Sequence, residues 1–145
     1  MSGVILTDIV DAAIRAHGRA TYPHECCGAL LGRDGVVHDA HALPNTTNEG
    51  PRRRFLVRPD DYRAAEGRAR DTGTELLGFY HSHPDHPAVP SQYDLDHAWP
   101  SFHYIIVSVM TGTDGDMQSW LLCEDRSRFE EEPVHLKPQA LSLKP

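Results

Sequence analysis

Residues 76–94 decide the fold and read Leu-Leu-Gly-Phe-Tyr-His-Ser-His-Pro-Asp-His-Pro-Ala-Val-Pro-Ser-Gln-Tyr-Asp. The apolar first half has the length and composition of a strand, which we expect over residues 76–83 and which Pro84 ends. A short helix is expected to begin at Ser91. The two-residue period of a strand places four side chains on one inward face: Leu77, Phe79, His81 and His83.

Two histidines and one aspartate in this stretch are candidate metal ligands. His81 and His83 lie about 7 Å apart on one strand face, so their imidazoles can converge on one ion. Asp94 follows His83 by eleven residues and lies just inside the short helix. Three nitrogen and oxygen ligands without a fourth are typical of a catalytic zinc site. The chain has ten histidines, so a His-x-His pair alone proves little, and it is the position of this pair on one strand face that favours a metal site.

Ser91 and Asp94 also have a purely structural interpretation. Ser-x-x-Asp after a proline is typical of a capping box, in which the acid reaches back to the N-cap amide. We expect the two roles to compete, because a metal-bound carboxylate is not free to close the cap. The preceding histidine pair favours the metal role for Asp94. Ser91 can cap the helix and still present its hydroxyl to a substrate.

The bulk composition indicates a single globular domain of 145 residues. A net charge of −7 argues against nucleic-acid binding by the whole molecule. We see no signal peptide and no apolar run long enough to cross a membrane. The chain has three cysteines, of which Cys26 and Cys27 are adjacent and Cys123 is distant in the sequence. We therefore expect no disulfide framework, and we expect a cytoplasmic location.

Around this stretch the pattern predicts further elements, and their order indicates the fold class. They are a helix capped by Thr7 and running to about Gly18, a strand over 27–32, a hairpin at Asp34-Gly35, a loop over 44–54, a strand over 55–57, a helix over 59–72, and strands over 104–110 and 117–123. We expect a domain over 1–132 and a Pro-interrupted, partly frayed tail over 133–145. The order predicts a mixed α/β (α+β) fold with antiparallel pairs, not a doubly wound parallel fold.

The combined motif resembles the signature of the JAMM (JAB1/MPN/Mov34) zinc metalloprotease family. That signature consists of an upstream glutamate, then His81-Ser82-His83-Pro84, Ser91 and Asp94. Glu25-Cys26-Cys27-Gly28 occupies the place of the glutamate and resembles the small prokaryotic branch. Further similarities are Asn45 to Phe55, Pro59, Gly78-Phe79-Tyr80 and Ala88-Val89-Pro90. The resemblance spans roughly residues 5–130 and implies a single-domain JAMM/MPN fold with a cytidine-deaminase-like architecture.

The resemblance also implies roles for these residues. His81, His83 and Asp94 would hold one Zn²⁺, Glu25 would act as the general base, and Ser91 would stabilise the oxyanion. Small prokaryotic relatives cut after the Gly-Gly terminus of ubiquitin-like or sulfur-carrier proteins, some releasing cysteine and others acting as isopeptidases. The expected partner is therefore such a carrier, with neither nucleic acid nor membrane involved. Only eight residues separate Asp94 from His103, which favours a small adduct over a polyubiquitin linkage.

Several alternatives remain beside this interpretation. Cys26 or Cys27 with His24 suggests a cysteine hydrolase, although the alternation points one cysteine into the core. A zinc deaminase would need H-x-E and P-C-x-x-C motifs, which this chain lacks. Isopeptidase activity on protein conjugates and a non-catalytic MPN scaffold are the alternative functions. Arg54 and Phe55 are candidate substrate-binding residues beside an extended Gly-Gly tail, and a solvated basic loop is the competing interpretation.

Overall fold

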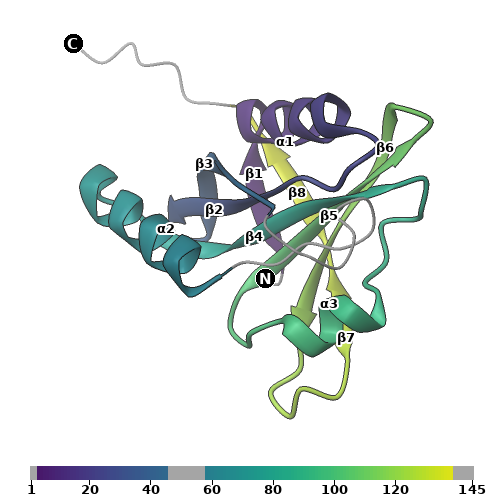
Figure 1. The fold of residues 1–145 in the computed structure, drawn as a ribbon. Coiled ribbons are helices and arrows are strands. Elements are labelled where there is room, and N and C mark those ends of the chain that lie inside the picture. The colour runs from purple at the N-terminus through teal and green to yellow at the C-terminus, as the bar shows by residue number, and fades with distance from the viewer. Residues whose placement is uncertain (1–2, 46–57, 139–145) are drawn as a thin grey trace.

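Eight strands form one mixed sheet in the computed structural model, which describes residues 3–45 and 58–138 (Figure 1). The strands are β1 (Val4–Thr7), β2 (Cys27–Arg33), β3 (Val36–Leu43), β4 (Glu75–Pro84), β5 (His103–Met110), β6 (Thr113–Leu122), β7 (Phe129–Glu132) and β8 (Val134–Lys137). They lie in the order β7-β6-β5-β4-β2-β3-β1-β8. Most neighbouring pairs are antiparallel, and β4–β5, β1–β3 and β1–β8 are parallel. The predicted mixed class is therefore confirmed.

Helix α1 (Asp8–Thr21) begins where the sequence predicts. The Thr7 hydroxyl accepts a hydrogen bond from the Val10 amide at 3.2 Å, as an N-cap does. Val10 and Ile14 are buried against the sheet, whereas Ile9 is exposed. The helix therefore turns its Val10/Ile14 pair to the core and runs three residues beyond the expected end at Gly18.

The hairpin and the two other helices also match the prediction. Asp34 and Gly35 both have positive φ, at 56° and 78°, and connect β2 to β3 by a tight turn. Helix α2 (Pro59–Thr72) begins at its proline and ends before Gly73, whose φ of 70° gives a left-handed C-cap. Helix α3 (Gln92–His97) follows the N-cap Ser91. No helix in the described ranges is long and apolar enough to cross a membrane.

Two apolar cores lie on opposite faces of the sheet. One core lies beneath α1 and contains Val10 and Ile14 of that helix, and we call it the α1 core. The other lies beneath α2 and contains Ala65 and Ala69 of that helix, and we call it the α2 core. Figure 1 shows α1 and α2 on separate sides of the strands. This arrangement explains the continuous apolar character of the central strands, because both of their faces are covered.

A β-bulge in β4 changes which side chains share the histidine face. Leu31 pairs with Leu76 and Leu30 pairs with Gly78, so Leu77 is an extra residue on β4. Leu77 packs against the α1 core, whereas Phe79 packs in the α2 core. The prediction that Leu77 lies on the face of Phe79 is therefore wrong, because strict alternation assumes an uninterrupted ladder.

Three strands were not predicted: β1, β7 and β8. The frayed end expected beyond residue 133 is wrong for Val134–Lys137, because these residues form β8 and pair in parallel with β1. The division into 1–132 and 133–145 stays a prediction. The strand expected over 55–57 and most of the loop over 44–54 lie outside the described residues.

Candidate active site

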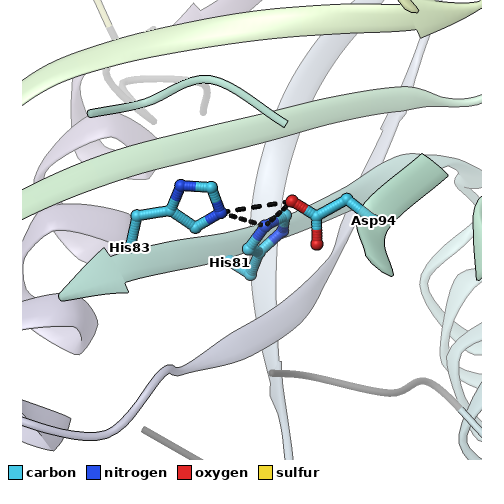
Figure 2. Close-up of side chains that lie close together, drawn as sticks. All are labelled: His81, His83 and Asp94. Carbon is cyan, nitrogen blue, oxygen red and sulfur yellow. Dashed lines mark hydrogen bonds and ion pairs between the residues drawn. The ribbon is translucent and has the colours of Figure 1, made fainter. Parts of the chain in front are cut away.

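Three predicted site residues converge near the end of β4. His81 and His83 lie on the α2-core face of this strand, and Asp94 lies in the first turn of α3. The Nε2 atoms of the two histidines are 3.1 Å apart. Asp94 Oδ2 is 3.3 Å from His81 Nε2 and 3.2 Å from His83 Nε2 (Figure 2). All three side chains are buried. Within the described residues they form the one group of this kind that can hold a metal ion.

A main-chain carbonyl sets the tautomer of His83. His83 Nδ1 lies 2.8 Å from the carbonyl oxygen of Pro87. A carbonyl can only accept, so Nδ1 carries the hydrogen and donates it. Nε2 of the neutral ring then presents its lone pair toward Asp94 and His81, the orientation a metal-binding histidine requires.

The protonation states also suit a cation. Burial by itself would raise the pKa of Asp94, but the interactions with His81 and His83 outweigh it and hold that pKa well below its usual range. Burial lowers the pKa of His81, against the opposing effect of Asp94. An ionised carboxylate and a neutral imidazole are the forms that bind metals, and the directions of these two pKa shifts favour them.

Asp94 closes a capping box while it faces the histidines. Its Oδ2 accepts a hydrogen bond from the Ser91 amide at 2.9 Å, and the Asp94 amide donates to Ser91 Oγ at 3.0 Å. The same oxygen that closes the cap also faces both histidines, so whether capping and metal binding compete for this carboxylate stays a prediction. The cap orients the carboxylate toward His81 and His83.

The Ser91 hydroxyl lies next to this group. Its oxygen accepts from the Asp94 amide, and a serine hydroxyl that accepts still has its own O–H to donate. Both functions that the sequence allows for Ser91 are therefore compatible, namely capping α3 and donating a hydrogen bond to a substrate.

Glu25 lies at the entrance to β2 and its residue is only 4% exposed. Cys27 pairs with His81 in the β2–β4 ladder. One residue earlier, Cys26 is hydrogen-bonded to Ser82. Glu25 is in phase with Cys27, which belongs to the α2 core on the histidine face. The register therefore brings Glu25 beside the end of β4 that carries His83.

A pocket of about 490 Å³ opens beside Glu25. It lies where β2 begins, where β3 ends and where α1 ends. Its lining residues are His17, Thr21, His24, Glu25, Cys26, Leu43, Pro44 and Asn45. The Asn45 side chain donates to the Glu25 carbonyl at 3.1 Å and so attaches the end of β3 to this segment. The predicted substrate-binding residues Arg54 and Phe55 lie outside the described residues.

The adjacent cysteines do not form a nucleophilic site. Cys26 is buried in the α1 core and Cys27 in the α2 core, and both are free thiols. Burial raises the pKa of Cys26 to about 11 and that of Cys27 to about 12. A catalytic cysteine needs an accessible thiolate at neutral pH, so the geometry gives no support to the cysteine-hydrolase alternative.

Sequence reasoning missed the groups that orient this site. The Pro87 carbonyl holds His83, and the Ser82 hydroxyl accepts from the Cys26 amide at 2.9 Å. Neither contact leaves a signal in the pattern, because one partner in each is a main-chain atom brought close only by the fold.

The fold agrees with the comparison to known proteins. Residues 8–123 match the model of the prokaryotic homologs of the JAB domain. The chain therefore belongs to this family. A JAB1/MPN domain protein from Archaeoglobus fulgidus has the same fold, with a TM-score of 0.62 over 92% of this chain and 98% of that chain, at 18% identity.

Two more similar proteins cover nearly the whole chain, and a third covers just over half of it. The CysO-cysteine peptidase of Mycobacterium tuberculosis is 31% identical over 144 residues, which are 94% of this chain and 92% of that protein. A solution structure from Desulfitobacterium hafniense has a TM-score of 0.81 at 33% identity over 94% of each chain. The desampylase of Haloferax volcanii is 36% identical over 89 residues, which are 59% of this chain and 63% of the desampylase. These relatives and the family make this chain a hydrolase of the JAMM class.

Proposed function

We propose that the chain is a zinc-dependent hydrolase that cleaves the amide bond after the C-terminal Gly-Gly of a ubiquitin-like or sulfur-carrier protein and releases cysteine. The observation that carries the proposal is the convergence of His81, His83 and Asp94 within 3.3 Å of one another. The similarity to a CysO-cysteine peptidase over 94% of the chain supports the choice of substrate. The free thiols support the cytosol as the compartment.

The three side chains suit Zn²⁺ in ligand type and in number. Two imidazoles and one carboxylate are a catalytic zinc ligand set that leaves one position open. The Pro87 carbonyl and the capping box hold two of the three ligands from behind. When bound, zinc would polarise the substrate carbonyl and lower the pKa of a water to about 7.

The remaining steps belong to residues of the chain. Glu25 orients the attacking water, takes one proton from it, and later gives that proton to the leaving amine. The new C–O bond forms at the carbonyl carbon of the second glycine, and the C–N bond to the leaving amine breaks. Ser91 donates its O–H to the oxyanion that develops in between. Loss of this donor should cost about 10²-fold in rate.

A Gly-Gly tail fits a site of this kind because it has no side chains to accommodate. Such a tail binds through its main chain, extended beside strand backbone. The link between the end of α3 at His97 and the start of β5 at His103 is short, so this side of the site carries no added domain. Arg54 and Phe55 stay candidates for contacts to the carrier.

Intact-mass spectrometry of carrier proteins tests this proposal. Carriers ending in Gly-Gly-Cys, or joined through Gly-Gly to a lysine, are incubated with the zinc-loaded enzyme, its Glu25→Gln variant, or enzyme with a chelator. We expect loss of one cysteine residue from the first carrier, and no loss with the variant or the chelator. Zinc-loaded enzyme that leaves both carriers intact would overturn the substrate class. Unchanged activity in Glu25→Gln would overturn the role of Glu25.

Isopeptidase activity is the second candidate function. The similarity to a desampylase supports it, although the matched region covers only 59% of this chain. In the same experiment, cleavage of the lysine conjugate alone would favour this function.

A further inference from the structure

Asp85, directly after the His-Ser-His-Pro motif, joins three segments of the chain. Its carboxylate accepts a hydrogen bond from the Tyr22 hydroxyl, at 2.9 and 2.8 Å to its two oxygens, and a second from the Thr111 amide at 2.7 Å. The Asp85 amide itself donates to the Val109 carbonyl at 2.8 Å. Asp85 thus links the end of β4 both to the β5–β6 turn and to the segment that follows α1.

Tyr22 belongs to the connection that carries Glu25 from α1 to β2. Two main-chain hydrogen bonds hold the start of this connection against the end of α1. They run from the Tyr22 amide to the Gly18 carbonyl and from the His24 amide to the Thr21 carbonyl. The Tyr22 ring also packs beside Gly112 in the β5–β6 turn, where an added Cβ would lie 3.7 Å from the ring. The position of Tyr22 is therefore set by contacts outside its own segment.

The same connection is attached to β4 at its other end. The Cys26 amide donates to Ser82 Oγ at 2.9 Å, and the Ser82 amide donates to the Cys26 carbonyl at 3.2 Å. Ser82 and Asp85 lie on either side of His83 in the sequence. We call these two attachments, Tyr22–Asp85 and Cys26–Ser82, the two-point clamp.

Glu25 lies between the two points of the clamp. One attachment falls three residues before it and the other falls one residue after it. A general base must be held within about 0.5 Å of its productive position. A hydrogen bond to an ionised carboxylate is roughly twice as strong as one between neutral groups, so the Tyr22–Asp85 bond is a strong constraint on a short segment.

We propose that Tyr22 and Asp85 are positioning residues, which hold Glu25 in register with His81 and His83. This inference rests on the proposed role of Glu25 as the general base. Neither residue touches the reacting atoms, and the clamp acts through the backbone of residues 22–26. It links the geometry of the base directly to the strand that carries the two histidines.

The primary test removes one oxygen atom, with the variant Tyr22→Phe. We expect kcat on a Gly-Gly-Cys carrier to fall about tenfold, because a small misplacement of a catalytic group is costly. KM and zinc content should stay unchanged, since the ligands and the substrate contacts are untouched. Tyr104→Phe is the matched control, because it deletes a hydroxyl that accepts from the Trp99 amide at 2.7 Å away from the clamp. It should leave kcat within about twofold by the same reasoning.

A double-mutant cycle shows whether the two residues act through one contact. Asp85→Asn retains an acceptor and tolerates the positive φ of 58° at this position, so it removes charge without backbone strain. If Tyr22 and Asp85 act together, the kcat of the double variant should be no lower than that of the less active single variant. Full additivity of the two losses would contradict the clamp.

Two further measurements separate positioning from a general structural effect. In a Glu25→Gln background, Tyr22→Phe should cause no additional loss of the residual rate, because its effect passes through Glu25. Amide hydrogen exchange at Cys26 should accelerate in Tyr22→Phe and stay unchanged in the core of β5.

Each outcome has a distinct meaning. An unchanged kcat in folded, zinc-loaded Tyr22→Phe would overturn the inference, as would a loss of kcat that follows a loss of zinc. Full activity of Glu25→Gln would instead refute the proposed role of Glu25 as the general base, so the two failures are distinguishable. Thermal unfolding of each variant confirms that folded protein is compared.

Discussion

Asp94 shows how one side chain can close a helix cap and also face two histidines. Its Oδ2 accepts from the Ser91 amide and lies within 3.3 Å of the nitrogens of His81 and His83. The cap therefore holds the carboxylate in place without an ion, which would reduce the conformational entropy lost in binding one. His83 is held in the same way by the Pro87 carbonyl.

Asparagine and alanine at this position should separate the two roles. Asp94→Asn keeps an oxygen that can close the cap but removes the negative charge, so zinc affinity should fall by at least about 100-fold. Asp94→Ala should lose zinc as well and, with chelator present, should be less stable than Asp94→Asn by about 1 kcal/mol, because the hydrogen bond from the Ser91 amide to the side chain of residue 94 is gone. Zinc titration and urea unfolding measure the two effects. Full zinc binding and full activity in Asp94→Ala would refute the assignment.

At the scale of elements, the pairing of β2 with β4 depends on close packing at Gly28. The Tyr80 side chain lies over this residue, and a Cβ there would come within 2.2 Å of the ring. The Tyr80 hydroxyl reaches His17 Nδ1 on α1 at 2.7 Å, so the ring is held from its far end. Gly28 therefore allows the helix and the two strands to pack together beneath the site.

Gly28→Ala should consequently destabilise the protein, because the ring and its helix contact must shift. We expect a loss of about 1–3 kcal/mol in the free energy of unfolding. Gly67→Ala in α2 is the matched control, since the nearest atom to its added Cβ is the end of the Arg70 side chain at 3.7 Å. This control should stabilise the helix by roughly 0.5–1 kcal/mol. Equal free energies of unfolding for the two variants in urea would show that a Cβ at position 28 does not disturb the packing of Tyr80.

At the scale of the whole molecule, β8 joins the two ends of the described chain. It pairs with β1 in parallel over four residues, from Val4 with Val134 to Thr7 with Lys137. Val4 and Leu6 of β1 belong to the α1 core and are fully buried. The last strand therefore covers an edge that would otherwise expose the backbone of β1.

Removal of residues 134–145 should lower the melting temperature well below that of a chain lacking only residues 139–145, which retains β8. The expected cause is loss of the β1 pairing and partial exposure of the α1 core. Circular dichroism on heating compares the two chains. Identical melting curves would show that β8 adds nothing to stability.

Local pattern and motif chemistry accounted for much of the fold and of the candidate site. Thr7, Pro59 and Ser91 marked helix starts correctly because capping and proline effects act over one turn. Strands β1, β7 and β8 escaped prediction because each has only four residues. Their formation depends on partners far away in the chain, which no local period reveals.

The sequence by itself determined the candidate metal ligands, because His81, His83 and Asp94 are recognisable by type and spacing alone. It also determined the mixed fold class, through the order of helical and extended patterns. Only the tertiary structure decided how these groups are oriented: the bulge at Leu77, the shared oxygen of Asp94 and the attachment of Tyr22 to Asp85. The physical reason is that orientation comes from hydrogen bonds and packing between distant segments, whereas identity and periodicity are properties of neighbouring residues.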